Sequence, residues 1–193
     1  MEKFLQNPLI EKQLSFDFGK SRGATRYEKW PSHIDIWQKQ GKKAVDFIYA
    51  DTSSKTLFFT EVKDFIRIDK KSGTYGEGTY SSNAQSPFEI TAMDELEQKF
   101  KDSMHGFEMA KNSADVDEKN FSLTYKNYSY RVVLHWEFKQ GARNEERRKA
   151  QMTLMKTKLR MRLQGVCTHV FVENMQDAPS KYWNVRRQGR NKP

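Results

Sequence analysis

The sequence is poor in residues that form covalent or zinc cross-links, and it has no long apolar run. Of its 193 residues only Cys167 is a cysteine, which excludes an intramolecular disulfide and a cysteine-rich zinc site. The four histidines are scattered without metal-ligand spacing. No stretch approaches the length that spans a bilayer, and the N-terminus lacks the apolar segment of a secretory signal. These absences predict a cytoplasmic protein that does not enter membranes.

Basic residues outnumber acidic ones. Lysine and arginine total 34 against 25 aspartates and glutamates, which gives a formal net charge of +9. Such an excess favours attraction to polyanions, and nucleic acid is the first candidate. Charge alone is equally consistent with a generic basic protein. The aromatic content of 13% argues against a disordered chain.

Two short apolar runs near the middle of the chain form a predicted hairpin. Residues 44–49 and 57–63 each alternate with the period of a β-strand, and residues 51–55 between them have the composition of a turn. A four-residue loop in an antiparallel hairpin pairs Asp51 with Thr56. The register of the two strands follows from that pair.

This register brings acidic residues together. It places Asp46 directly opposite Glu61, with both carboxylates on one face. Residues two apart on a strand share a face, so Lys63 points the same way as Glu61. Like charges in such a position repel, and a divalent cation held between them is the simplest reason for the arrangement.

Through Asp46 and the triplet Glu61-Val62-Lys63, the chain resembles the PD-(D/E)xK nuclease superfamily. Val45 stands where the family name places proline, a departure that many members share. The resemblance implies that Asp46, Glu61 and the backbone carbonyl of Val62 bind Mg²⁺ or Mn²⁺. It also implies that Lys63 assists hydrolysis of a phosphodiester. Chance alone produces isolated Glu-x-Lys triplets, and an edge strand that ends in solvated charges is the alternative interpretation.

Members of this family often have a further acidic residue in the element before the aspartate strand. We prefer Glu28 for this role, because the neighbouring Tyr27 and Trp30 suggest an ordered element, and Asp35 is the alternative. A surface charge is the simpler interpretation of either residue.

Basic side chains that contact nucleic acid are expected on two helices and near the C-terminus. Solvated helix faces and a disordered terminus are competing explanations for them. The candidates are Lys99, Arg147, Arg148, Arg186 and Arg187.

The remaining pattern predicts strands that alternate with helices. Apolar alternation, capping residues and glycines indicate strands over residues 14–18, 131–138 and 166–173, and helices over 31–40, from Pro87 onward, and over 142–164. Residues 69–87 are expected to form a long polar loop, and residues 112–120 to break the helical pattern.

This order of elements predicts an α/β fold with a mixed central β-sheet flanked by helices. It matches the restriction-endonuclease-like core that the resemblance implies, over residues 24–173. Residues 1–178 are expected to form a single nuclease-like domain. Residues 179–193 are expected to form a basic C-terminal tail that has little to pack.

The leading hypothesis is a magnesium-dependent endonuclease that acts on DNA in repair, recombination or defence. RNA is the nearest alternative substrate, because the same chemistry hydrolyses either backbone. Structure-directed or partner-directed cleavage is favoured over sequence-specific cleavage, since 193 residues leave no room for a large specificity domain. A protein partner or a homodimer is compatible with this hypothesis. The alternative is a non-catalytic nucleic-acid-binding or protein-interaction module that retains the nuclease fold.

Overall fold

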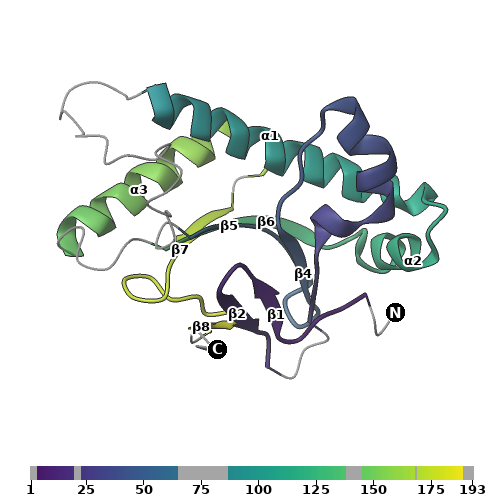
Figure 1. The fold of residues 1–193 in the computed structure, drawn as a ribbon, viewed down its shortest axis with the longest axis horizontal. Coiled ribbons are helices and arrows are strands. Elements are labelled where there is room, and N and C mark those ends of the chain that lie inside the picture. The colour runs from purple at the N-terminus through teal and green to yellow at the C-terminus, as the bar shows by residue number, and fades with distance from the viewer. Residues whose placement is uncertain (1–3, 20–22, 65–86, 138–144, 168, 189–193) are drawn as a thin grey trace, which may run out of the picture.

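A mixed five-stranded sheet forms the centre of the molecule (Figure 1). The computed structural model describes residues 4–19, 23–64, 87–137, 145–167 and 169–188. Its five strands are adjacent in chain order, antiparallel from β3 to β5 and parallel from β5 to β7. They are β3 (Ala24–Thr25), β4 (Phe47–Asp51), β5 (Thr56–Asp64), β6 (Ser129–Glu137) and β7 (Val170–Glu173). The predicted mixed α/β sheet is therefore confirmed.

Helices cover one face of this sheet (Figure 1). The parallel connection from β5 to β6 includes the helices α1 and α2, and the connection from β6 to β7 includes α3. None of the described helices combines the length and apolarity needed to span a bilayer. The helical segments are η1 (Tyr27–Lys29), η2 (His33–Trp37), η3 (Gln38–Gln40), α1 (Pro87–Met109), η5 (Ala110–Asn112), α2 (Val116–Tyr125) and α3 (Glu145–Arg162).

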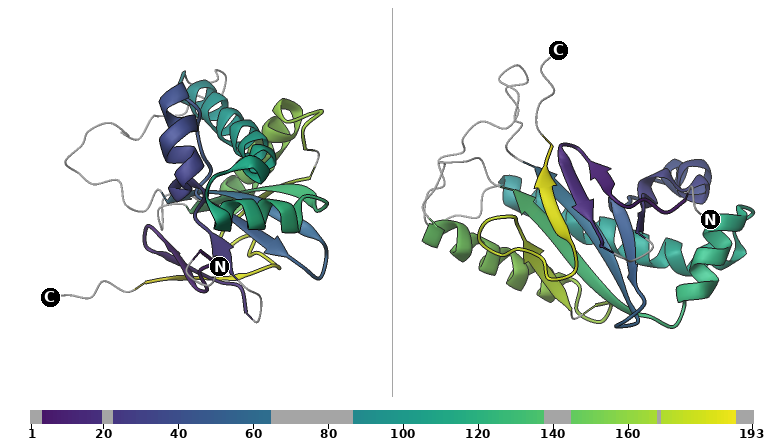
Figure 2. Two further views of the ribbon diagram at one scale, coloured as in Figure 1. Left: turned by 90° about the vertical axis from the view of Figure 1, so that its right-hand side faces the viewer. Right: turned by 90° about the horizontal axis from the view of Figure 1, so that it is seen from below.

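A second sheet covers the opposite face (Figure 2). It has three antiparallel strands in the order β1-β2-β8, formed by β1 (Leu9–Glu11), β2 (Leu14–Asp17) and β8 (Asn184–Arg187). Helices thus flank the central sheet on one side, and the prediction did not include the second sheet.

Two sequence predictions are corrected by the structure. Residues 112–120 were expected to break the helical pattern, but only residues 113–115 do so, because α2 begins at Val116. Residues 179–193 were expected to have little to pack, but Trp183 is buried and β8 pairs with β2 along its length. The chain after residue 188 lies outside the described residues, as does the loop expected over residues 69–87 apart from Pro87, which begins α1.

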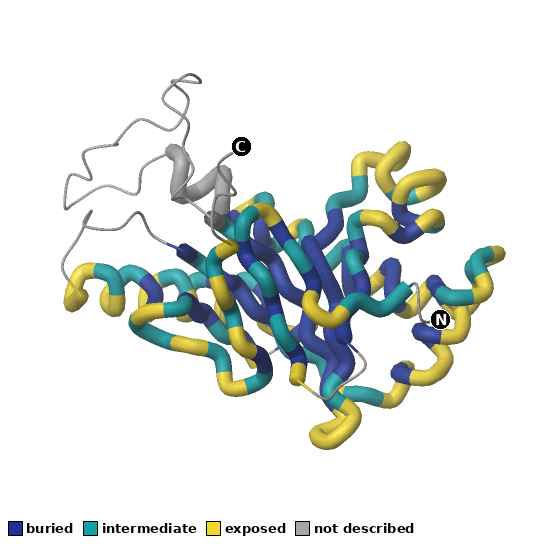
Figure 3. The backbone as a smooth tube through the Cα atoms, turned by 60° about the horizontal axis from the view of Figure 1, so that its bottom comes forward, coloured by how far each residue is buried: buried dark blue, intermediate teal, exposed yellow. Residues whose placement is uncertain are grey.

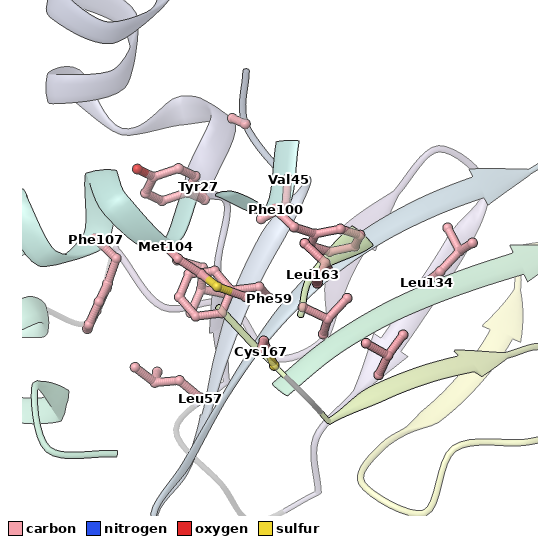
Figure 4. Close-up of a cluster of buried hydrophobic side chains, with 14 of the residues drawn as sticks. Tyr27, Val45, Leu57, Phe59, Phe100, Met104, Phe107, Leu134, Leu163 and Cys167 are labelled. Atoms are coloured by element: carbon pink, nitrogen blue, oxygen red, sulfur yellow. The ribbon is translucent and has the colours of Figure 1, made fainter. Parts of the chain in front are cut away.

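Two apolar cores result from this layering, one on each face of the central sheet. Leu57 and Phe59 belong to the core under the helices, where the ring of Phe59 packs edge-on against Phe107 of α1 (Figure 4). Phe58 and Val62, which alternate with them along β5, belong to the core between the two sheets. The central strands are accordingly the most continuously buried part of the molecule (Figure 3).

The β4–β5 hairpin has the predicted register. Asp51 pairs with Thr56 at the turn, and Phe47 pairs with Thr60 at the other end. Continuing this antiparallel register by one residue places Asp46, which directly precedes β4, opposite Glu61.

Helix α1 packs closely against η1, which brings the two elements to the same end of the sheet. Gly106 allows this approach, because a Cβ atom there would lie 2.0 Å from the hydroxyl oxygen of Tyr27. Phe100 and Met104 on the same helix are buried against the sheet. Lys99, beside Phe100, is thereby held close to the end of β5.

Candidate active site

Asp46 is a buried carboxylate at the start of β4. Its side chain is 6% exposed, and its Oδ2 atom accepts a hydrogen bond of 2.6 Å from the backbone N–H of Val62. Burial raises the pKa of Asp46 to about 7, and the nearby carboxylate of Glu61 adds to this increase. The two acidic residues are therefore close enough to repel, as the register predicts.

Glu61 is buried more deeply and is held by two ammonium groups. The Nζ atoms of Lys99 and Lys63 lie 2.7 Å and 3.0 Å from its Oε1 atom. Burial disfavours the charged form of Lys63, but the Glu61 carboxylate outweighs this effect and raises the Lys63 pKa overall. The structure thus confirms that Glu61 and Lys63 share a face, and it brings Lys99 from α1 to the same carboxylate.

The backbone carbonyl of Val62 also has a cationic neighbour. Lys12, which directly follows β1, donates a hydrogen bond of 2.5 Å from Nζ to this oxygen. Glu11 beside it is buried and pairs with Arg26 at 2.8 Å. Burial raises the pKa of Glu11, and Arg26 partly opposes that shift.

Sequence reasoning did not find Glu11 and Lys12. No motif surrounds them, and Lys12 lies 50 residues from Val62 in the chain. Only the packing of the second sheet against the end of β5 brings them to this site, so no local pattern could have identified them.

The donor set fits a hard divalent cation. Two carboxylates and one carbonyl provide the oxygen ligands that Mg²⁺ or Mn²⁺ prefers. Within the described residues the Oε2 atom of Glu61 is buried without a hydrogen-bond partner, as expected for an atom that has a ligand still to receive. The described residues contain no group of three or more histidine, cysteine, aspartate or glutamate side chains arranged for a metal. The predicted set of Asp46, Glu61 and Val62 has only two such side chains.

Glu28 lies beside this site, on η1. Its carboxylate is 3.8 Å from Arg26 and 3.5 Å from Lys29, and it contributes to the raised pKa of Glu11. Glu28 and Lys99 also line the same cavity. Asp35, the alternative acid, is exposed on η2. The geometry therefore favours Glu28 over Asp35 as the further acidic residue.

The predicted arginines form two pairs of neighbours, one on α3 and one on β8, and Lys99 is on a third element, α1. Arg147 is exposed on α3, and Arg148 binds Asp177 through two contacts of 2.8 Å. Arg186 and Arg187 belong to β8, on the opposite side of the central sheet from α3 (Figure 1). The structure does not bring these four arginines together into one surface with Lys99.

A second group of buried polar residues lies on the face of the sheet turned away from α1. The Nε2 atom of His135 lies 2.9 Å from Oε1 of Glu137, and Glu173 is the register partner of His135 on β7. Burial raises the pKa of Glu173 to about 7. The ring of His135 packs edge-on against Phe16, which places the group beside the second sheet.

No protein-family model, curated protein or solved structure matches the chain. The resemblance to PD-(D/E)xK nucleases therefore depends on Asp46, the triplet 61–63 and the order of the strands.

Proposed function

We propose that this protein is a metal-dependent nuclease that hydrolyses phosphodiester bonds in nucleic acid, with DNA as the preferred substrate. The observation that supports it most is the convergence of Asp46, Glu61 and Lys63 at one end of adjacent strands, with an unpartnered Glu61 oxygen. An antiparallel hairpin followed by a helical crossover to a parallel strand also agrees with a restriction-endonuclease-like core.

Each residue of the site has a separate role in the proposed reaction. Asp46, Glu61 and the Val62 carbonyl hold the cation, which when bound supplies Lewis acidity to the phosphodiester. The ammonium of Lys63 positions the attacking water and offsets negative charge that develops on the phosphate. Lys99 holds the Oε1 atom of Glu61 at 2.7 Å and fixes the orientation of that carboxylate.

The net charge and the lysines at the site support a polyanionic substrate. A net charge of +9 attracts a polyanionic backbone, and the candidate site itself includes the ammonium groups of Lys12, Lys63 and Lys99. These contacts suit phosphates and carry no base-specific information. Cleavage directed by nucleic-acid structure or by a protein partner, in repair, recombination or defence, is the role that we propose.

A specific observation favours a second candidate, a non-catalytic nucleic-acid-binding module. Lys12, Lys63 and Lys99 together place three ammonium groups against the Val62 carbonyl and the Glu61 carboxylate. These cations offset much of the acidic charge without a metal. A chain that uses them in this way would bind phosphates but hydrolyse nothing.

A cleavage assay separates the two candidates. Purified protein is incubated with supercoiled, linear and single-stranded DNA and with RNA, in Mg²⁺, Mn²⁺ or chelator. A nuclease cleaves at least one substrate only with metal and loses this activity in Lys63→Ala. Lys101→Ala, which removes a lysine that pairs with Glu97 elsewhere on the protein, is the matched control and retains activity. Absence of metal-dependent cleavage, or equal cleavage by both variants, would contradict the nuclease proposal.

A further inference from the structure

A basic cavity of about 510 Å³ lies between the η1–η3 segment and α1. Its lining combines two parts of the chain that are far apart in sequence. The charged and titratable residues of the lining are four lysines, one glutamate and one buried histidine: Lys29, Lys42, Lys43, Lys99, Glu28 and His33.

The charge of this cavity is only partly compensated. Glu28 is its one acidic residue and lies 3.5 Å from Lys29. Lys42 pairs at 3.2 Å with Asp102, and Lys99 pairs at 2.7 Å with Glu61; neither acid is part of the lining. The side chain of Lys43 makes no ion pair with any described residue. The cavity therefore presents a net positive charge, which attracts an anion.

The cavity adjoins the candidate active site. Lys99 lines it and also contacts the Oε1 atom of Glu61 at 2.7 Å. Ala44, two residues before Asp46, forms another part of the wall. Lys99 therefore links the cavity to the carboxylate of Glu61.

The cavity is large enough, and its lining varied enough, to hold a molecule bigger than a phosphate group. A volume of about 510 Å³ lies in the range of sites that enclose small organic molecules, roughly 300–1,000 Å³. Ile34 contributes an exposed apolar surface, and Gln38 contributes an amide. Burial lowers the pKa of His33, so its imidazole is neutral near pH 7 and offers hydrogen bonding without charge. Cationic, apolar and neutral polar contacts together are what a nucleotide requires.

We propose that this cavity binds one nucleotide of the substrate strand, next to the phosphodiester held at Asp46 and Glu61, with Lys43 contacting its phosphate. This inference rests on the proposed nuclease function and adds a place for the substrate. The cavity is open to solvent on one side, so the nucleotide it holds can stay continuous with the rest of the strand.

The test measures binding without catalysis. A 5′-phosphorylated dinucleotide, in deoxyribose and ribose forms, is titrated into the full chain by calorimetry in the presence of chelator. Lys43→Ala is expected to weaken binding about tenfold, because a charged hydrogen bond to phosphate is lost. Lys39→Ala, an exposed residue of η3 outside the lining, is the matched control and binds like the wild type. The two sugar forms distinguish DNA from RNA as the source of the nucleotide.

Three results would overturn the inference: no binding by the wild-type protein, equal binding by Lys43→Ala, or equal losses in Lys43→Ala and Lys39→Ala. The last result would mean that net charge attracts the dinucleotide to the general surface. Failure of the nuclease proposal gives a different pattern, because the dinucleotide would still bind in chelator while metal-dependent cleavage would be absent. Thermal unfolding of both variants checks that each one folds.

Discussion

Buried carboxylates lie on both faces of the five-stranded sheet, and their surroundings differ. At the end of β4 and β5, Asp46 and Glu61 lie near ammonium groups from β5, from α1 and from the turn after β1. On the face beside the second sheet, Glu173 is the register partner of His135, and no described ammonium or guanidinium group is paired with it. Both Asp46 and Glu173 have a pKa raised to about 7.

The causes of the two raised pKa values differ. Burial is the largest cause at both positions, but only at Asp46 does a second carboxylate, that of Glu61, add to it. A proton is enough to neutralise Glu173, whose pKa no second carboxylate raises. A pair of carboxylates surrounded by cationic groups suits a divalent ion instead. Burial alone is therefore a weak indicator of a site, and charges that converge from several elements are a stronger one.

The largest expected effect is on the rate of cleavage, measured for one substitution on each face of the sheet. Glu61→Gln removes a charged ligand, so we expect metal-dependent cleavage to fall by more than about 100-fold. Glu173→Gln is the matched substitution on the other face, and we expect it to leave the cleavage rate unchanged. Gel assays under identical metal concentrations measure both variants. Equal losses in both would remove the distinction between the faces.

The second sheet is expected to matter for stability. Trp183 is buried between the sheets, so Trp183→Ala should lower the free energy of unfolding by about 3–5 kcal/mol. Truncation after Ala178 removes this side chain together with β8 and should be at least as harmful. Urea unfolding measures the change, and Gln188→Ala, at an exposed position just after β8, serves as the control. Unchanged stability of Trp183→Ala would show that residues 179–188 are dispensable for the fold.

A pH-dependent effect is expected at Glu173. Its pKa is raised in the folded protein from an ordinary 4.5 to about 7, so the folded state binds the proton more tightly than the unfolded state. Its contribution to stability is therefore complete below about pH 4.5 and is lost as pH rises to about 7, a change of about 3 kcal/mol. Glu173→Gln cannot ionise, so it should be more stable than the wild type at about pH 8 and similar to it at about pH 4.5. Urea unfolding at both pH values tests this, and a difference that does not vary with pH would contradict it.

The smallest expected effect concerns Lys12, whose ammonium lies on the Val62 carbonyl where a cation is expected to bind. Lys12→Met should tighten Mn²⁺ binding by about tenfold, because a competing charge is removed. Lys55→Met is a matched control, since Lys12 and Lys55 both have a positive φ angle. Lys55 lies in the turn at the other end of the β4–β5 hairpin. Calorimetric titration in the absence of nucleic acid compares the two. Unchanged Mn²⁺ affinity in Lys12→Met would mean that Lys12 only supports the fold.

The elements that sequence analysis found are those governed by local rules. Alternation and loop length determine the hairpin register, so the pairing of Asp51 with Thr56 could be predicted. Gly41, with φ of +75°, ends the helical segment where it was expected. Helix α2 could also have been found, since Asp115 caps it by accepting from the backbone N–H of Glu118, but its apolar periodicity is weak.

The second sheet and the position of Lys12 were not predicted, because they depend on contacts between distant segments of the chain. Strands β2 and β8 come from opposite ends of the chain, and Phe18, just after β2, packs edge-on against Trp183, just before β8. No pattern within either segment reveals the other. The same is true of Lys12 and Val62, so Asp46, Glu61 and Lys63 could be predicted while their cationic neighbour could not.

The central claim is that Asp46 and Glu61 hold a divalent cation, and direct titration of Mn²⁺ into the protein without nucleic acid tests it. Asp46→Asn keeps the size of the side chain and an oxygen to accept the Val62 N–H, but it removes the charge. We expect calorimetry to show Mn²⁺ binding by the wild type and no binding by Asp46→Asn. A wild-type protein that does not bind Mn²⁺, or an Asp46→Asn variant that binds it equally well, would contradict the claim.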